Sequence, residues 1–296
     1  MSSSVSGQAP PLSLVERAAL GIGRLANRGP VGKRLQYYYH YWINRTWVRE
    51  AVGRRVYVDN IESVVNLRPD RGVLMAANHR SFYDQWINML ALYDRGGNHF
   101  WKMYFPVRSN FFYDDPVGMA VNTVVAAWSM FPPIYRDASK ADLTRDALAK
   151  VQEFLGDPTA IVGVHPEGTR GKGPDPYELL PAQPGIGQMI LQGKPVVIPF
   201  FINGIGNKPA EVIATTQKRD GRRTDPIIIV YGSPVEYDDL ASKKPRAALY
   251  LKMAKRVNAA ISELMPREQE LRAGITSGEI GDDDPGWLAA PLPWNK

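Results

Sequence analysis

Short apolar runs alternate with amphipathic stretches between residues 54 and 264, and this alternation limits the fold more than any other feature of the sequence. The apolar runs have the length of β-strands, and apolar residues in the segments between them recur at helical spacing. We expect strands at Arg54–Val58, Gly72–Ala77, Ala160–Val164, Pro195–Ile202 and Pro226–Tyr231, and helices at Phe82–Tyr93, Asp142–Phe154, Ile186–Gln192 and Arg246–Leu264. Such alternation predicts an α/β fold, a single sheet-centred domain with helices on both faces.

The N-terminal region is predicted to form amphipathic helices that precede this domain. Apolar residues recur at helical spacing from residue 12 to 50, and the first 60 positions hold nine basic and three acidic residues. Aromatic side chains gather in the second half of the region, at Tyr37, Tyr38, Tyr39, Tyr41, Trp42 and Trp47. Rings beside arginines suit the headgroup layer of an anionic membrane. The plainer alternative is a helix that packs on the domain and exposes a solvated basic face.

The predicted organisation has three parts: the basic, aromatic-rich helical region 1–53, the sheet-centred domain 54–265 and a loop-rich tail 266–296. No stretch reaches the roughly 18–20 apolar residues of a spanning helix. Pro116–Tyr135 comes nearest, and we expect it to be a buried or interfacial helix that ends at Pro132 and Pro133. Met1–Pro11 is rich in Ser, Gly and Pro, so we expect no regular structure there, and it lacks the pattern of a signal peptide.

Composition excludes several classes of protein. A chain of 296 residues that is 44% hydrophobic buries too much apolar surface to be disordered. It has no cysteine, which excludes a disulfide framework, a thiolate zinc site and a cysteine nucleophile. Histidine chemistry must use one of only four residues, which are His40, His79, His99 and His165. The net charge of +6 attracts anions, but the basic helices carry no recognised nucleic-acid motif, so we expect no nucleic-acid partner.

The first candidate site is the segment from Asn78 to Asp84, which follows the predicted strand Gly72–Ala77. Ligands of open α/β sheets bind at the carboxyl ends of strands. If Ser81 caps the next helix, Asp84 lies in its first turn and can accept a hydrogen bond from His79. That bond fixes the tautomer and leaves the second ring nitrogen as a general base for a substrate hydroxyl. The alternative is that Asp84 only caps the helix and His79 is an ordinary loop residue.

The second candidate site runs from Val164 to Gly173 and also follows a buried strand, so it is expected at the same edge of the sheet. Pro166 and Gly168 predict a tight turn. Arg170 and Lys172 then lie in a glycine-rich loop, a composition that is typical of phosphate binding. A solvated turn with incidental basic residues is the alternative, in which His165 is a packed residue at the strand end.

Together the two segments resemble the glycerolipid acyltransferase family, which includes the 1-acylglycerol-3-phosphate acyltransferases. The resemblance rests on Asn78-His79-x4-Asp84, followed about eighty residues later by Pro166-Glu167-Gly168-Thr169-Arg170. Two weaker blocks agree with it: Ile134-Tyr135-Arg136 and Val196-Val197-Ile198-Pro199. The similarity extends over roughly residues 72–202, so it implies that 54–265 is an acyltransferase domain.

The resemblance implies a phospholipid-biosynthesis enzyme. It would transfer a fatty acyl group from acyl-CoA or acyl carrier protein to a hydroxyl of a lysophospholipid or glycerol phosphate, with no covalent intermediate, metal or cofactor. His79 would be the base and Asp84 would orient it. The implied substrate-binding residues are Asn78, Arg80, Lys102, Arg136, Glu167, Gly168, Thr169 and Arg170. Phe111–Phe131 could line the acyl chain, and lipid substrates imply a peripheral membrane location on the cytoplasmic face.

This sequence departs from the family pattern at three places. His165 replaces an aromatic residue, Gly171 replaces serine, and Phe131-Pro132-Pro133 stands where glycine and apolar residues are usual. These changes leave the His79 and Asp84 chemistry intact and keep the acceptor open. The alternatives are an acyltransferase for an ornithine-type lipid or a glycolipid, and a non-catalytic lipid-binding protein on the same fold.

Overall fold

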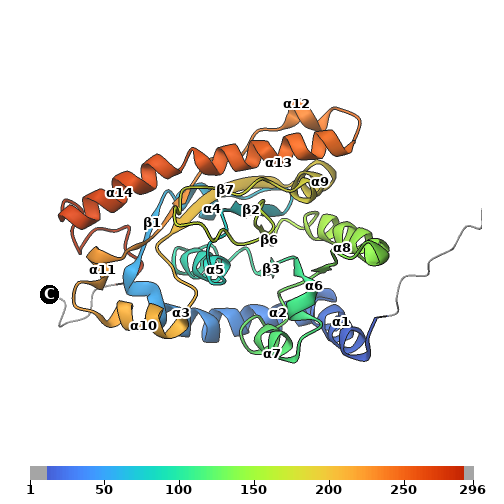
Figure 1. Ribbon diagram of the computed structural model, residues 1–296, viewed down its shortest axis with the longest axis horizontal. Helices are drawn as coiled ribbons and strands as arrows, with labels where there is room; N and C mark the ends of the chain where they lie inside the picture. The colour runs from blue at the N-terminus through green and yellow to red at the C-terminus, as the bar shows by residue number, and fades with distance from the viewer. Residues whose placement is uncertain (1–11, 290–296) are drawn as a thin grey trace, which may run out of the picture.

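A six-stranded sheet forms the centre of the computed structural model, which describes residues 12–289 (Figure 1). Its strands are β1 (Val56–Asp59), β2 (Val73–Ala77), β3 (Lys102–Tyr104), β6 (Ala160–Val164), β7 (Val196–Asn203) and β8 (Ile227–Tyr231). They are ordered β1-β8-β7-β2-β6-β3, and every neighbouring pair is parallel except β7 with β8. Two further strands, β4 (Val107–Arg108) and β5 (Pro133–Ile134), pair with each other.

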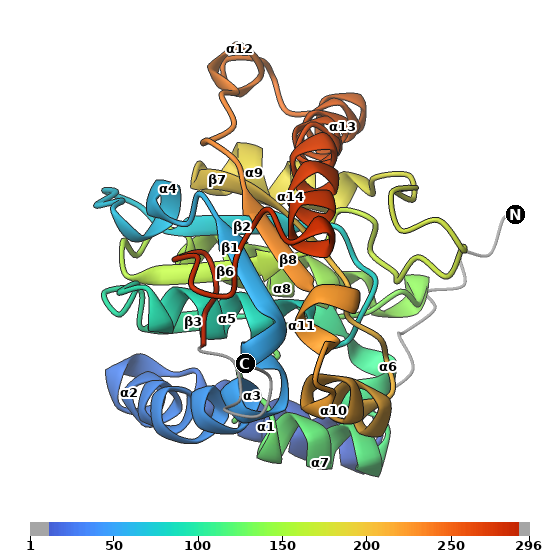
Figure 2. The ribbon, with the colours of Figure 1, turned by 90° about the vertical axis from the view of Figure 1, so that its left-hand side faces the viewer.

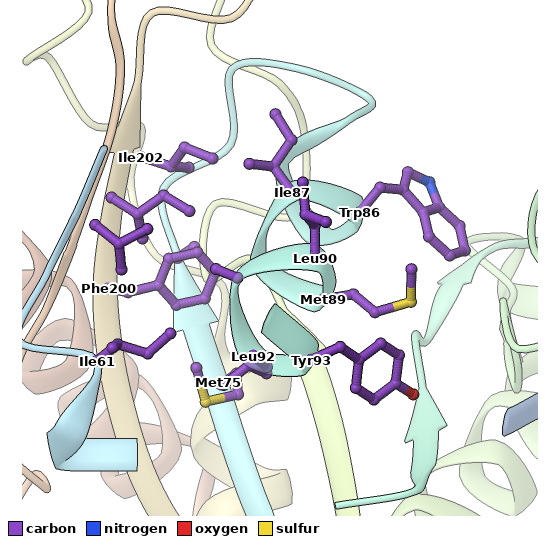
Figure 3. Close-up of a cluster of buried hydrophobic side chains, with 14 of the residues drawn as sticks. Ile61, Met75, Trp86, Ile87, Met89, Leu90, Leu92, Tyr93, Phe200 and Ile202 are labelled. Carbon is purple, nitrogen blue, oxygen red and sulfur yellow. The ribbon is translucent and has the colours of Figure 1, made fainter. Parts of the chain in front are cut away.

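Helices cover both faces of the sheet, which confirms the predicted α/β class. The helix α5 (Asp84–Asp94) packs on one face, where it meets Met75 of β2 and Phe200 of β7 (Figure 3). The other face holds α8 (Ala141–Phe154), α9 (Pro184–Gly193) and α13 (Ala247–Ser262). Neighbouring residues of β2 alternate between these two cores, since side chains of a strand point to opposite faces in turn: Val73, Met75 and Ala77 lie in the first, and Leu74 and Ala76 in the second.

The N-terminal helices are present as predicted and form a further layer outside α5 (Figure 2). They are α1 (Leu14–Ala26), α2 (Gly29–Tyr39), the π-helical turn η1 (His40–Asn44) and α3 (Arg45–Val52), with α7 (Pro116–Val124) beside them. Lys33, Gln36, His40 and Asn44 recur at helical spacing and are buried against the domain, whereas Leu35 and Trp42 face outward. The polar side of these helices is therefore inside and much of their apolar side is outside.

The remaining helices and turns complete the described chain. They are α4 (Glu62–Val65), α6 (Ser109–Phe112), α10 (Pro209–Gln217), α11 (Gly221–Thr224), α12 (Asp238–Ala241), α14 (Met265–Ser277) and the 3₁₀ turns η2 (Gly53–Arg55) and η3 (Ala138–Lys140). Within residues 12–289, no helix combines the length and the apolar character needed to cross a bilayer.

The expectation of one helix over Pro116–Tyr135 was wrong beyond Val124, where α7 ends. Ala127 and Trp128 adopt positive φ angles, and the Trp128 N–H donates to the Asn122 carbonyl, so the chain turns back on itself. The helix does not resume before Pro132 and Pro133, because a proline disfavours helical geometry in the residue before it.

The expectation of a loop-rich tail from residue 266 was also wrong in its first part, which forms α14. Its apolar stripe is narrow: Leu271 and Ile275 pack on Ile228 and Val230 of β8. A buried Glu268 on the same side pairs with Arg272, and this mixture of apolar and charged residues hides the helical period. The expectations for Met1–Pro11 and for the end of the tail, 290–296, concern residues outside the described part of the chain.

Candidate active site

Three loops meet at one edge of the sheet, because β2 lies between β6 and β7 and runs parallel to both. The carboxyl end of β2 leads into residues 78–84, that of β6 into 165–173 and that of β7 into 204–208. In parallel sheets this edge collects the loops that bind ligands. The topology therefore brings together the two segments that were singled out as candidate sites.

His79 and Asp84 form a hydrogen-bonded pair in the first of these loops. The Nδ1 atom of His79 lies 3.1 Å from Oδ2 of Asp84, and the carboxylate is fully buried while the imidazole is 22% exposed. A carboxylate only accepts, so Nδ1 carries the proton and Nε2 has a free lone pair. Among residues 12–289, no side chain or backbone group is hydrogen-bonded to Nε2, which leaves it able to accept a proton from a ligand.

The backbone of the loop fixes Asp84 in this orientation. Its Oδ2 atom also accepts hydrogen bonds from the backbone N–H groups of Arg80 (3.0 Å) and Ser81 (2.9 Å). Asp84 lies in the first turn of α5, as expected, but Ser81 is not its cap. The Ser81 hydroxyl instead donates to the carbonyl of Gly206 in the loop after β7. Asp84 thus organises the turn that carries His79.

Two residues predicted to bind substrate hold the loops in place. The Asn78 amide is buried and makes two hydrogen bonds of 2.9 Å with the backbone of Ile202, joining the ends of β2 and β7. Glu167 is also buried; its carboxylate accepts from the N–H groups of His79 (2.7 Å) and Leu180 (2.8 Å). Both side chains hold the loops of the site together, and their contact with a substrate stays a prediction.

Arginines from separate segments surround Gly168, the glycine of the second loop. Gly168 has a φ of +63°, a conformation that other residues rarely adopt, and its carbonyl accepts from both Arg108 and Arg136. Thr169 follows and is exposed. Arg136 was predicted to lie at the site and does so, whereas Arg108 was missed.

Asn207 connects two more arginines at the same rim. Its Oδ1 atom accepts from the guanidinium of Arg170 (2.8 Å), and its Nδ2 donates to the Arg80 carbonyl (3.0 Å). The Arg80 guanidinium in turn donates to the carbonyl of Gly173 (2.7 Å). The guanidinium groups of Arg80, Arg108, Arg136 and Arg170 therefore ring the loop 168–173 and give the entrance to His79 a concentrated positive charge.

Lys102 is not part of this site. It begins β3, opposite Ala160 at the start of β6, so it lies at the amino end of parallel strands whose carboxyl ends carry the site. Its ammonium pairs with Asp157 and lies 4.5 Å from the ring of Trp101. The sequence match that assigned it to substrate binding was wrong, because the polarity of the strand sends it to the opposite edge.

Burial shifts the pKa of both His79 and Asp84 toward the neutral form of each group. Burial holds the pKa of His79 below its ordinary value, and the guanidinium groups of Arg170 and Arg108 lower this pKa further. Burial raises the pKa of Asp84, against the opposing effect of its backbone hydrogen bonds and nearby cations. At neutral pH the lowered pKa keeps the His79 imidazole neutral. Because the pKa of Asp84 rises only to about 6, its carboxyl group is still mostly ionised, and the pair is in the form that accepts a proton.

These shifts predict how the activity depends on pH. A base acts only when unprotonated, and a lowered pKa keeps His79 unprotonated to lower pH, so kcat/KM should stay constant from pH 8 to about 6.5 and fall only below it. The measurement is kcat/KM against pH, with unfolding followed over the same range. An acid limb centred at or above pH 6.5 would contradict this arrangement.

His79, Asp84 and His165 are close enough to suggest a metal site, since one ligand atom of each lies within 4.8 Å of the others. The two imidazole rings are stacked, however, with centroids 3.8 Å apart and planes inclined by 10°. Ring lone pairs lie in the ring plane, so parallel rings do not direct them at one ion about 2 Å from each nitrogen. The trio is a poor set of metal ligands, and its geometry favours proton transfer.

An apolar cavity of about 220 Å³ lies beside the first loop. Phe82, Tyr83, Trp86 and Ile87 of that loop and α5 form one wall. The remaining walls come from α3, the end of α7 and the segment around α10: Trp47, Val48, Ala51, Val52, Val121, Val125, Ile205, Pro209, Val212 and Ile213. Only two residues of the expected groove Phe111–Phe131 line it, so the N-terminal helices contribute more to this cavity than the sequence suggested.

Arg108 and Asn207 were missed from sequence for different reasons. Asn207 follows the buried strand ending near Ile202, and that position alone marks it as a residue of the site edge. Arg108 ends the two-residue strand β4, between β3 and α6, where neither spacing nor resemblance identifies its partner. It reaches Gly168 only because the pair of β4 and β5 places it there.

Comparison with known proteins gives matches of different kinds. Residues 55–203, half of the chain, match the family described as Acyltransferase. Among solved structures, the chain is similar to the crystal structure of the 1-acyl-sn-glycerophosphate (LPA) acyltransferase PlsC from Thermotoga maritima, with 16% identity, a TM-score of 0.48 and coverage of 80% of this chain and 81% of that chain. No curated protein sequence matches. The family segment contains both motif loops, and the helices α1 to α3 precede it.

Proposed function

The chain belongs to the acyltransferase family, and from this premise we propose that it transfers a fatty acyl group from an acyl thioester to a hydroxyl of a lysophospholipid or glycerol phosphate. The observation that carries the proposal is the free Nε2 of His79: Asp84 holds its Nδ1, and the Arg170 and Arg108 guanidinium groups lie close enough to lower its pKa. A base, a phosphate-binding composition and an apolar cavity are the three elements that such a reaction requires.

In the proposed mechanism, Nε2 of His79 takes the proton of the acceptor hydroxyl as its oxygen attacks the thioester carbonyl carbon. The buried carboxylate of Asp84 stabilises the imidazolium that forms. The tetrahedral intermediate then expels the thiolate, which receives the proton from His79. The acyl group passes directly between substrates: the chain has no cysteine, and the Ser81 hydroxyl is engaged with Gly206 and is not bonded to His79.

The apolar cavity is the proposed place of the acyl chain. Its walls begin at Phe82 and Tyr83, three and four positions after the catalytic histidine. It ends among residues of α3 and α7, the helices of the outer layer. An acyl chain held there would place its thioester near His79, and the proposed donor is acyl-CoA or acyl carrier protein.

The arginine rim is the proposed site of the acceptor phosphate. Loss of the Arg170 guanidinium removes a charge-assisted contact, so Arg170→Ala should raise the KM of a phosphorylated acceptor about 10–100-fold and leave the KM of the donor within twofold. Arg145→Ala, which removes an exposed arginine that pairs with Asp142 of the same helix α8, is the matched control. Equal effects of Arg170→Ala on both substrates would argue against a phosphate site here.

The outer layer of helices is the proposed membrane-docking surface. Leu14, Leu25, Val31, Leu35 and Trp42 are each at least 65% exposed. Of the large apolar side chains exposed in residues 12–289, all but Ile213 and Leu251 lie on the segments α1 to α3, α6 and α7. Arg24, Arg28 and Arg34 are exposed on the same helices. This surface suits peripheral binding to an anionic membrane on the cytoplasmic face, where thioester donors are found.

A charge placed on this surface should release the protein from membranes. Leu35→Glu removes an inserting side chain worth about 1.5–3 kcal/mol when buried, so partition onto anionic liposomes should fall at least tenfold. Leu251→Glu on α13, across the sheet from α2 in Figure 1, is the matched control. Binding of the wild type should weaken in high salt. Equal losses in both variants, or none in Leu35→Glu, would remove the basis for this surface.

The acceptor is tested directly with a panel of lipids. Purified protein with acyl-CoA should acylate lysophosphatidic acid or another lysophospholipid or glycerol 3-phosphate, as read by mass spectrometry. If only an ornithine-type lipid or a glycolipid were acylated, the role of His79 as base would stand and the proposed acceptor would be wrong. Lipid binding without acylation of any acceptor would favour a non-catalytic protein.

A further inference from the structure

The imidazole of His165 covers one face of the proposed base. Its ring lies parallel to that of His79, with the centroids 3.8 Å apart and an angle of 10° between planes. His165 directly follows β6, whereas His79 lies in the loop after β2, so two neighbouring strands bring the rings together. A single hydrogen bond to Asp84 leaves the His79 ring free to tilt, and the stacked ring opposes that motion.

Both nitrogens of His165 are engaged. Nδ1 lies 2.9 Å from the carbonyl of Asn78 and 3.2 Å from that of Ala77, and because carbonyls only accept, Nδ1 carries the proton. Nε2 lies 3.4 Å from the side-chain nitrogen of Gln85 and accepts from it. His165 is thus held as a neutral imidazole in the less common tautomer, with its proton on Nδ1.

A directional chain of buried side chains supports this tautomer. The Tyr231 hydroxyl donates to Oδ1 of Asn88 (2.8 Å), and Nδ2 of Asn88 donates to Oε1 of Gln85 (3.4 Å). Tyr231 has only this proton to give, so the chain runs one way and leaves the Gln85 N–H for His165. Gln85, Asn88 and Tyr231 are each at most 8% exposed, so water does not compete with these bonds.

The sheet makes room for this chain at Gly163. A Cβ atom on Gly163 would lie only 2.7 Å from Oε1 of Gln85, closer than carbon and oxygen approach. A residue larger than glycine at position 163 would displace the side-chain amide of Gln85. The glycine, two positions before His165, is therefore a further part of the same arrangement.

We propose that His165 is a positioning residue, which the Tyr231–Asn88–Gln85 chain holds as the neutral Nδ1–H tautomer so that its ring fixes the plane of His79. In that plane Nδ1 of His79 meets Asp84 and Nε2 faces the acceptor. The proposal rests on the proposed function in one respect, the role of His79 as base. Because His165 is neutral, it does not repel the imidazolium that forms when His79 takes the proton of the acceptor hydroxyl.

The tautomer is tested without any assay of activity. Long-range ¹H–¹⁵N NMR distinguishes the tautomers of histidine, and the chain has only four histidines, which single variants assign. Wild-type His165 should be protonated on Nδ1 and unprotonated on Nε2 from pH 6 to 8. In Gln85→Leu the His165 signals should shift toward a mixture of tautomers. An Nε2–H tautomer in the wild type, or no change in Gln85→Leu, overturns the proposal whatever the protein catalyses.

The ring stack is tested by kinetics, with thermal unfolding as a check on the fold. His165→Ala should lower kcat at least tenfold and leave both KM values within twofold, because it loosens the base and touches no substrate. His165→Phe keeps a flat ring in the same place and should recover kcat to within about threefold of the wild type. Wild-type kcat in His165→Ala, or the same loss in both variants, overturns the positioning role. A wild type that transfers no acyl group would instead refute the proposed function and leave the NMR result standing.

Discussion

His79→Ala is expected to lower kcat by about 10²–10⁴-fold, the contribution that a positioned base typically makes. The fold should survive, because the two hydrogen bonds that hold residue 79 to the second loop use its backbone. Its N–H donates to Glu167, and its carbonyl accepts from the N–H of Gly171. The measurement is the initial rate of acyl transfer, with the thermal unfolding midpoint as the control.

The result separates a catalytic role for His79 from a structural one. A variant that unfolds at the wild-type temperature and has lost its activity supports the assignment of the base. A folded His79→Ala that transfers acyl groups at nearly the wild-type rate would show that another group takes the proton.

Asp84→Asn is expected to cause a second large loss of kcat, by about 10²–10³-fold. An amide oxygen can still accept from the N–H groups of Arg80 and Ser81, so the turn before α5 should form. The variant lacks the negative charge that stabilises the imidazolium, and its NH₂ group would take the place of Oδ1, which is buried and has no hydrogen-bond partner among the described residues.

Kinetics across pH distinguish this variant from one that is merely unstable. Without the carboxylate the pKa of His79 should fall further, so the residual activity should extend to lower pH than in the wild type. A residual activity with the wild-type pH dependence, or a rate close to that of the wild type, would mean that Asp84 does not act through His79.

The central strands were predicted from sequence to within two residues of their ends, because they are buried on both faces and read as continuous apolar runs. The same reasoning missed β3, which has only three residues at the edge of the sheet. It also missed α10, which buries only Val212 and Thr216, and α14, whose apolar face is narrow and interrupted by charged residues. Local periodicity finds elements that are uniformly buried and loses those that depend on a particular neighbour.

The candidate site was predictable where function depends on position along a strand and unpredictable where it depends on contacts. The pairing of His79 with Asp84 followed from their spacing at a strand end. The same motifs could not show that Glu167 holds the loop that carries His79, since the hydrogen-bond partner of Glu167 is the backbone N–H of a residue 88 positions away. Lys102 was misplaced because a short sequence match carries no information about the direction of its strand.

The arrangement of the elements connects the proposed site to the proposed membrane surface. The apolar cavity has one wall on the His79 loop and others on α3 and α7. The outer layer that contains those helices turns apolar side chains outward and buries polar ones such as Lys33 and Asn44. We propose that an acyl chain passes from a membrane to the base by way of this cavity, while the arginine rim holds the headgroup.

Direct acyl transfer with His79 as the base is tested by measuring the product and the protein in the same reaction. Purified wild type and His79→Ala are incubated with acyl-CoA and lysophosphatidic acid on anionic vesicles, and mass spectrometry reads the lipid and the intact chain during turnover. We expect the wild type to form one phosphatidic acid for each CoA released and to gain no acyl mass, and His79→Ala to form almost no product. An acylated wild-type chain, or equal product from both proteins, would contradict direct transfer with His79 as the base.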